Sequence, residues 1–427
     1  MQMEALDGLR HHILCPISLQ PMQDPVTAPT GITYDRRAIE RWLAAGHATC
    51  PVSGQPLAIA DLTPNHTLRR LIHSCLLPRP PPEPHRPEVA ADDLVKKLTC
   101  SASRPPFDEI RAAAEAAAGS EVARRRMVDA GVLRGALRLA VSCCAKNKKS
   151  GGDQGGVDMP AAEACLDLAL ALVVSGDELS QLVAAGHGHG HELVDAVTDV
   201  LVALEPGLGD AARASAVRLL DSVTEAAGAA ALARLRPDLF RAVTAALRDR
   251  LSPGATRAAL RALLHACPAG RNRALAVEAG AAHEAIELEL DAPPPPSSSP
   301  SPGSDGGRRT TELVLALLAE VCQCADGRAA VAAHPAGVAV VARRLLRVSA
   351  GADASAVRVL AAVGGRAASP ATLLEMARVG AVGKLCCVLQ ADCDAGVKEA
   401  ARAVLRLHSG VWTGSPCVSA YLLSRYL

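Results

Sequence analysis

Aromatic side chains are scarce in this sequence, at 2% of 427 residues. Surfaces that hold single-stranded nucleic acid stack bases on aromatic rings, and β-strands are enriched in the same residues. The scarcity therefore argues against a base-stacking surface and against most sheet-rich folds. Alanine and leucine dominate instead, and both favour helices.

An excess of charge of one sign is also missing, because Lys+Arg (45) and Asp+Glu (44) almost cancel. No global field would steer the protein to nucleic acid or to acidic lipid. The most apolar window, Ala164 to Val174, contains Asp167 and is too short to cross a bilayer. We therefore expect no nucleic-acid partner and no membrane span.

Signals for export are absent as well. The N-terminal run lacks the basic start and the long apolar stretch of a signal peptide. The 14 cysteines are scattered and do not resemble a disulfide framework. We expect reduced, mostly buried thiols and a soluble protein of the cytoplasm, with the nucleus as a second location.

Breaks in composition divide the chain. Residues 78–92 are Pro-rich and predict an extended linker, because proline fixes φ and removes a hydrogen-bond donor. The linker separates a head, residues 8–77, from a body, residues 93–427. Two low-complexity segments, about 147–160 and 291–309, are predicted to be flexible insertions within the body.

A short sequence pattern of small and apolar residues recurs along the body. Copies surround Gly131, Gly186, Gly280, Gly337 and Gly380, and a weaker copy carries Pro237 in place of glycine. Two pairs of neighbouring copies, Pro237 and Gly280, and Gly337 and Gly380, are 43 residues apart, which fits armadillo/HEAT repeats of two or three helices. We expect each glycine to make a left-handed turn after the first helix of its repeat. The alternative is an irregular helical bundle.

The head reads as loop, hairpin, helix, loop and helix. Gly31 predicts a hairpin turn between short strands at 26–27 and 32–34. Asp35 is suited to cap a helix over 36–43, and Asn65 or Thr63 to cap a final helix.

These residues carry a family resemblance. In order, CPIS, DPV, TGITYDR, IERWL, TCPV and DLTPNHTLRRLI resemble a plant-type U-box along its whole length. With the repeats, nearly the entire chain is similar to the plant U-box/armadillo E3 ubiquitin ligases. The implied fold is mainly α: a small α+β U-box, RING-like but zinc-free, followed by an all-α armadillo/HEAT-like superhelical solenoid.

The head itself also argues against a zinc RING. A RING needs eight ligands for two zinc ions, whereas the head offers three cysteines and no C-x-x-C. We expect neither metal nor cofactor. The two lobes should instead be joined by hydrogen bonds, ion pairs and apolar contacts among Cys15, Asp24, Tyr34, Asp35, Arg36, Glu40 and Asn65.

The resemblance implies an E3 without a catalytic residue of its own. An E2 enzyme carries ubiquitin as a thioester, the U-box positions it, and the armadillo repeats bind the protein substrate. The E2-facing groove would use Ile17, Leu19, Trp42 and Pro51. Four apolar residues at loop tips form the kind of exposed patch that marks a partner site. A homodimer through the U-box is a further expected partnership.

Each of these residues has an alternative interpretation. Ile17 and Leu19 are alternatively core residues of the hairpin. Trp42 is alternatively packed beneath its helix, and Pro51 is alternatively a turn former only. Cys15 is interpreted as a core thiol, against the alternatives of a metal ligand or a nucleophile.

One position departs from the family pattern. Many E3s of this type place an Arg, Lys or Gln soon after the second-loop proline, and this side chain clamps E2 to ubiquitin. Here the position is Gly54, which has no side chain, and the neighbouring Gln55 is a candidate substitute. The departure predicts weaker activation of the E2–ubiquitin conjugate than in members with the cation.

Several rival interpretations stay open. His187, His189 and His191 alternate with glycine, and an inserted, solvated loop is favoured there over a metal site. The basic runs 124–126 and 146–149 are interpreted as solvated helix ends. At the level of the whole chain, the main alternative to a ligase is a non-catalytic armadillo adaptor or scaffold with a degenerate U-box. An armadillo-type binder of nucleic acid or import signals is a third.

Overall fold

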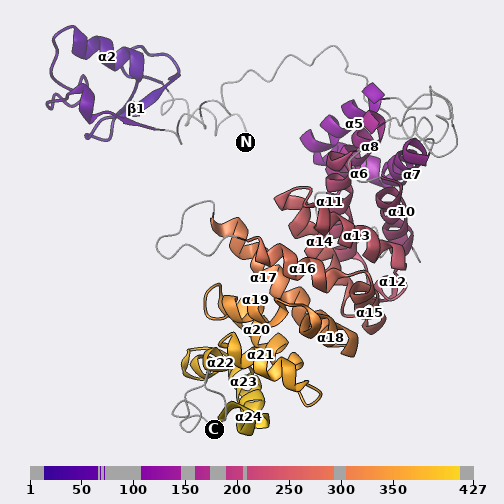
Figure 1. Ribbon diagram of the computed structural model, residues 1–427. Helices are drawn as coiled ribbons and strands as arrows, with labels where there is room; N and C mark the ends of the chain where they lie inside the picture. Colours follow the sequence, from indigo (N-terminus) through magenta and orange to yellow (C-terminus); the bar gives the residue numbers. More distant parts are fainter. Residues whose placement is uncertain are drawn as a thin grey trace. The chain divides into compact units, whose positions relative to one another are not determined.

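The computed structural model describes residues 14–65, 68, 72, 107–145, 159–173, 189–204, 209–292 and 304–413. Two compact units make up the chain, Met1–Glu88 and Val89–Leu427, and both are drawn in Figure 1. The division falls between the head and the body expected from the sequence. The predicted linker at 78–92 lies outside the described residues.

A small antiparallel sheet and one helix form the described head. Strands β1 (Pro25–Thr27), β2 (Thr33–Asp35) and β3 (Thr63–Pro64) pair in the order β2-β1-β3. Val26 lies opposite Tyr34 on one side and Pro64 on the other. The predicted hairpin is confirmed, and Gly31 makes its turn with φ 81°. Strand β3 was not expected, because proline disfavours strands; it is tolerated here on an edge strand.

Asp35 fixes where the helix of the head begins. Helix α2 (Arg36–Ala44) starts after Asp35, whose side chain accepts from the N–H of Arg37. The same carboxylate accepts from the N–H groups of Gln23 (2.7 Å) and Asp24 (3.1 Å). One side chain therefore caps the helix and holds the loop before β1.

The body is built from three series of stacked helices (Figure 1). The first helices of the repeats are α6 (Glu121–Asp129), α12 (Ala229–Leu232), α15 (Gly270–Glu278), α18 (Ala325–Ala333) and α21 (Pro370–Arg378). The second helices are α7 (Val132–Ala145), α10 (His189–Ala203), α13 (Pro237–Asp249), α16 (Ala281–Leu290), α19 (Gly337–Arg344) and α22 (Ala381–Gln390). The third helices are α5 (Phe107–Gly119), α8 (Met159–Leu172), α11 (Asp210–Ala226), α14 (Pro253–Ala266), α17 (Ser304–Val321), α20 (Ala350–Val363) and α23 (Ala395–Leu407). The short α24 (Ser409–Thr413) follows the last of them.

Contacts run between equivalent helices of consecutive repeats. Each third helix from α5 to α20 packs on the next third helix, and each second helix from α7 to α19 packs on the next second helix. This order confirms the predicted armadillo-like stack. It follows from the sequence, because helices such as α8 and α14 are buried on more than one face and need neighbours on both sides.

The repeat glycines fall into two classes. Gly131, Gly280 and Gly380 have φ of 82°, 84° and 74°, so the predicted left-handed turn is confirmed there. It is wrong at Gly337, which is the first residue of α19. Pro335 stops α18 at that repeat instead, and Gly337 is required because a Cβ would lie 2.1 Å from the carbonyl oxygen of Val331. Gly186 lies outside the described residues.

Helices begin inside the far ends of both segments that were predicted to be insertions. Helix α17 begins at Ser304, so the end of the segment 291–309 is helical. Helix α8 likewise begins at Met159, just inside the segment 147–160. Both segments are rich in glycine and charged residues, which are typical of loops, so the sequence did not predict where these two helices begin. Among the described residues, no helix is both long and apolar enough to span a membrane.

Gly380 and Gly383 provide a matched test of the turn. Gly380→Ala should lower the free energy of unfolding by about 1–2 kcal/mol, because φ is 74° there. Gly383→Ala, at the third residue of α22 with nothing within 4 Å of the added carbon, should raise it by about 0.5–1 kcal/mol. Urea unfolding of both variants measures the difference. Equal effects of the two substitutions would contradict the assigned turn.

Candidate functional site

Two loops of the head have the same backbone hydrogen-bonding pattern. The first runs from Leu14 to Pro21 and the second from Thr49 to Pro56, and an isolated β-bridge closes each. In each loop the cysteine N–H donates to the glutamine carbonyl five residues on, at 2.9 Å for Cys15 and 2.8 Å for Cys50. Both loops carry Cys-Pro-x-Ser-x-Gln-Pro. This short internal repeat is the signal that could have predicted the pair of loops.

Leu19 and Gly54 occupy the same position in the two loops. Each N–H donates to the carbonyl of its loop's cysteine, at 2.8 Å for Leu19 and 2.9 Å for Gly54. Each backbone is left-handed, with φ 54° at Leu19 and 70° at Gly54. Glycine adopts this conformation freely, whereas leucine is strained in it. The leucine side chain is 76% exposed, so the alternative that Leu19 is a core residue is wrong.

Strained backbone that holds an apolar side chain in solvent is typical of binding sites rather than of cores. Glycine at this position would remove the strain, and Gly54 shows that the same turn forms with glycine. Packing inside the head cannot explain the leucine, because its side chain is mostly in solvent. Leu19 therefore makes the first loop a candidate contact surface.

The other predicted site residues surround the two loops. Ile17 is partly buried and packs against the same core cluster as Trp42. The indole N–H of Trp42 donates to the carbonyl of Thr49 at 2.9 Å and joins α2 to the second loop. The ring of His47 stacks on the indole at 4.1 Å between centroids. Pro51 is partly exposed.

Val52 is a member of this surface that was not predicted from the sequence. It occupies the position of Ile17 in the second loop and is 58% exposed. Leu19 and Val52 are thus exposed apolar side chains of the two loops, with Ile17 and Trp42 half-buried beside the core. An aromatic residue flanked by aliphatic ones, partly desolvated, is the usual composition of a binding hot spot.

The adjacent residues Tyr34 and Asp35 on β2 form hydrogen bonds with the sulfur atoms of both cysteines. The backbone N–H of Asp35 donates to Sγ of Cys15 at 3.3 Å, and the hydroxyl of Tyr34 lies 2.9 Å from Sγ of Cys50. Cys15, Cys50 and Tyr34 are all buried. Both thiols are therefore part of the packing that positions the loops.

Burial raises the pKa of the Tyr34 hydroxyl, and its hydrogen bond to Cys50 adds to the rise. Burial also acts to raise the pKa of the Cys50 thiol. Hydrogen bonds from Ser53, Tyr34 and the backbone of the second loop outweigh it and lower the pKa to about 6. The proton is thus held on the tyrosine, and the sulfur accepts the hydrogen bonds of the loop.

The remaining structural residues of the head form polar bonds between its segments. Arg36 binds Asp24 at 2.6 Å and lies 3.7 Å from Glu40 one turn further along α2. The amide of Asn65 donates to Thr27 on β1 at 3.2 Å, and its side-chain oxygen accepts from the N–H of Leu68 at 2.9 Å. Asn65 therefore both caps the final segment and joins it to the sheet.

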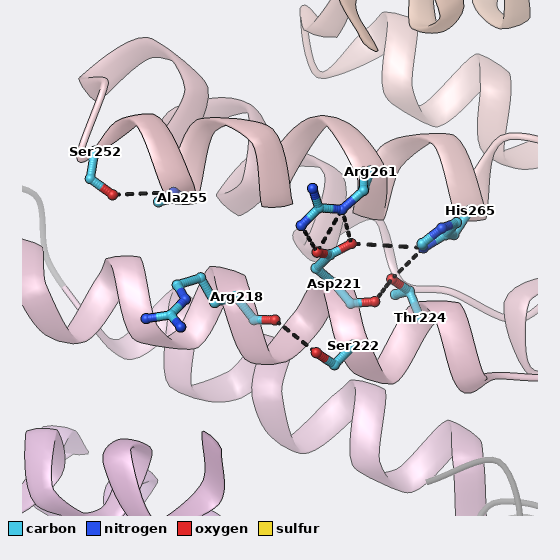
Figure 2. Close-up of polar contacts among 8 residues, drawn as sticks. All are labelled: Arg218, Asp221, Ser222, Thr224, Ser252, Ala255, Arg261 and His265. Carbon is cyan, nitrogen blue, oxygen red and sulfur yellow. Dashed lines mark hydrogen bonds and ion pairs between the residues drawn. The ribbon is translucent and has the colours of Figure 1, made fainter. Parts of the chain in front are cut away.

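A separate polar cluster lies in the body between α11 and α14. Figure 2 shows Arg261 and His265 of α14 directed at Asp221 of α11. Arg261 donates to both carboxylate oxygens, and the ring of His265 lies 3.9 Å from one of them. Burial raises the pKa of Asp221, and the bonds from Arg261 oppose the rise. The cluster joins helices of consecutive repeats.

Two further predictions from the sequence concern the body. His187 lies outside the described residues, as do the side chains of His189 and His191 and the basic run 146–149. The run 124–126 lies within α6, on residues that each have polar or electrostatic contacts.

Comparisons with known proteins cover both the head and the body. The U-box domain family matches residues 11–78, and the family of the plant U-box protein ARM repeat region matches residues 115–427. The E3 ubiquitin-protein ligase PUB23 of Arabidopsis thaliana is 36% identical over 97% of this chain and 96% of its own length. PUB22 of the same plant is 35% identical over 97% of both chains. PUB24, also from Arabidopsis thaliana, is 32% identical over 98% of this chain and 96% of its own.

Among solved structures, a designed armadillo repeat protein in complex with a peptide matches 74% of this chain and 98% of its own, with a TM-score of 0.33 and 14% identity.

The lowered pKa of Cys50 predicts a pH dependence. The folded-state pKa is about 6 and the ordinary value is 9.0, so between pH 6 and pH 9 the unfolded chain binds more protons than the folded one. The free energy of unfolding of the head should therefore rise with pH across this window. In Tyr34→Phe the rise should be smaller, because one hydrogen bond to the sulfur is lost.

Urea unfolding followed by Trp42 fluorescence, in a Trp412→Phe background, measures this slope at each pH. The slope is the readout, since Tyr34→Phe also lowers stability at every pH by removing a buried hydrogen bond. Parallel pH profiles for the two proteins would show that Tyr34 does not control the thiol.

Proposed function

Because the chain belongs to the plant U-box, ARM-repeat family of E3 ubiquitin-protein ligases, we propose that it docks its E2 enzyme on the two loops of the head. The single observation that carries the proposal is Leu19, an exposed leucine in a left-handed backbone. Ile17, Trp42 and Pro51 complete the docking surface, and Val52 adds to it.

The chemistry takes place on the E2. The amine of a substrate lysine attacks the thioester carbonyl, an isopeptide bond forms, and the E2 cysteine leaves as its thiol. The U-box contributes orientation, by restricting a mobile ubiquitin-loaded enzyme to conformations in which the thioester can be attacked. The armadillo body binds the protein that supplies the lysine. No residue of this chain needs to act as acid, base or nucleophile.

The rigidity of the loops supports this role. Their cysteines are tied to β2 and their ends are closed by bridges, so the apolar tips are held in place before the E2 arrives. Preorganised contact residues lose little side-chain freedom on binding, which favours affinity.

Leu19→Gly separates docking from folding. Glycine relieves the strained backbone, so the free energy of unfolding should change by less than about 1 kcal/mol. Loss of one hot-spot side chain should weaken E2 binding by roughly tenfold. Single-turnover discharge of ubiquitin from the charged E2, at sub-saturating ligase, should fall by a similar factor. Ile17→Ala should reduce discharge in the same way.

Ile59→Ala is the matched control, because Ile59 is 57% exposed on the 3-10 turn Ile59–Asp61 and lies in neither loop. This variant should discharge ubiquitin like the wild type. Equal rates in Leu19→Gly and wild type would refute the docking surface. No discharge by any of the proteins would favour the alternative, a non-catalytic armadillo scaffold.

Gly54 sets the level of activation in this proposal. The family's cationic clamp is absent, and Gln55 is adjacent, with its carbonyl tied to the N–H of Cys50 at 2.8 Å. An arginine at Gly54 must adopt a φ near 70°, as Leu19 does near 54° in the first loop. Gly54→Arg should therefore fold and should accelerate ubiquitin discharge.

Gly54→Leu supplies the same backbone strain without the charge, so it should not accelerate discharge. If arginine and leucine give the same rate as glycine, weak activation is not due to the missing cation. Gln55→Ala tests the substitute directly: a lower rate would assign the clamp to Gln55.

We also propose that the U-box forms a homodimer. Ile59 provides support, since it is an exposed apolar side chain outside the docking loops. Light scattering during gel filtration should give twice the monomer mass, and Ile59→Asp should restore the monomer without changing the rate of ubiquitin discharge per chain. A monomeric wild type at all concentrations would contradict the dimer.

We propose that the ligase works in the cytoplasm and also enters the nucleus. Among the described residues no disulfide joins two cysteines, and most of these cysteines are buried. A sequence with 14 cysteines and no disulfide among those described suits a reducing compartment. A fluorescent fusion at either end should show both locations, and secretion would contradict the proposal.

A further inference from the structure

Three metal-binding side chains meet in the body, far from the U-box loops in sequence. They are His283 and Glu287 of α16 and His334 at the end of α18. Their ligand atoms all lie within 4.8 Å of one another. Nε2 of His334 is 3.0 Å from the carboxylate of Glu287, and the two imidazole rings are 4.9 Å apart between centroids.

The local sequence explains why these side chains converge. His283 and Glu287 are four residues apart in α16, so they project from the same face on successive turns. Pro335 disfavours a helical conformation for the residue before it, and His334 accordingly leaves α18 in an extended conformation with ψ 128°. Gly337 then lets the chain pass over the end of α18 with its N–H bonded to the carbonyl of His334 at 3.0 Å.

We propose that His283, Glu287 and His334 form a zinc site. Two imidazoles and one carboxylate are a ligand set that Zn²⁺ uses in proteins, with water in the fourth position. Tetrahedral zinc at about 2.0–2.1 Å from each donor holds the donor atoms roughly 3.4 Å apart. The separations here, from 3.0 Å for one pair to 4.8 Å at most, include that spacing. Small rotations of exposed side chains would close the set.

Exposure gives the ion a route. The side chain of His334 is 7% exposed and that of Glu287 is 40% exposed, while His283 is an exposed residue. A cation would therefore approach past His283 and Glu287 and meet His334 at the bottom of the site. Water in the fourth position would lie on the solvent side.

Proton positions set the strength of binding. Nδ1 of His334 accepts from the N–H of Ala336 at 3.2 Å, so the neutral ring carries its proton on Nε2 and donates it to Glu287. Zinc takes the place of that proton on Nε2, the ring proton moves to Nδ1, and the Ala336 contact is lost. Losing one hydrogen bond weakens the affinity by roughly tenfold relative to a preformed site.

The site would join two consecutive repeats. Helix α16 belongs to one repeat and α18 to the next, and the two helices are in contact. An ion that binds only the folded body stabilises it by mass action. Zinc at this position would therefore act as a clamp between neighbouring repeats, and it does not depend on the ligase function proposed for the head.

The test uses the full-length protein, freed of metal with a chelator and titrated with Zn²⁺, and with Co²⁺ as a spectroscopic probe. Wild type should bind one more equivalent of Zn²⁺ than His283→Ala, and zinc should raise the melting temperature of the body. Glu287→Gln should weaken zinc binding at least tenfold. Visible Co²⁺ bands of a tetrahedral site without the near-ultraviolet thiolate band should appear in wild type and be lost in both variants.

Glu284→Gln is the matched control on the same helix, because Glu284 pairs with Arg248 at 2.8 Å and not with the histidines. It should bind zinc like the wild type. His283→Ala removes an exposed side chain, so its folding is expected to be intact, and circular dichroism checks this. Equal zinc stoichiometry in wild type and His283→Ala, or cobalt bands only of the thiolate kind, would overturn the proposal.

Discussion

The head depends on two neighbouring residues of β2 that hold two sulfur atoms. Asp35 donates its backbone N–H to Cys15, and the hydroxyl of Tyr34 contacts Cys50 at 2.9 Å. Each cysteine in turn closes its own loop by hydrogen bonds. A zinc RING would join comparable loops through metal–sulfur bonds. Here buried hydrogen bonds around each thiol take that role, and they leave the loop tips free to carry apolar side chains into solvent.

The body is stabilised by the packing of successive repeats on one another. A single pair of alanine-rich helices cannot cover its own apolar side chains. Stacking the helices in three series gives one continuous apolar core. Ion pairs such as Arg261–Asp221 and Arg213–Asp249 join one repeat to the next. The stack tolerates irregular copies, and the copy that ends in His334-Pro335 instead of a glycine turn is where the histidines and Glu287 meet.

Much of this architecture could be predicted from the sequence, since it is encoded locally. The turn at Gly31 and the helix cap at Asp35 depend on residues close by in the sequence. The 43-residue spacing of the repeats can be read directly from the sequence. The exposure of Leu19 was expected only from the family resemblance, because the residue type alone, an apolar residue near a hairpin, is equally consistent with the core. The left-handed turn predicted at Gly337 was wrong. Glycine is needed there because the backbone lies close to the carbonyl of Val331, and the sequence alone does not distinguish this reason from a left-handed turn. The proposed zinc ligand His334 lies 47 residues from Glu287 along the chain, so only the stacked helices reveal the cluster.

The central claim is that two thiol-anchored loops present an apolar surface to the E2. A titration of the isotope-labelled protein with an unlabelled E2, followed by amide and indole NMR signals, tests it most directly. We predict that the shifts concentrate at residues 16–20, at the Trp42 indole and at residues 50–54. Shifts confined to the face of β1 and β3, or no shifts at a saturating concentration of any E2, would contradict it.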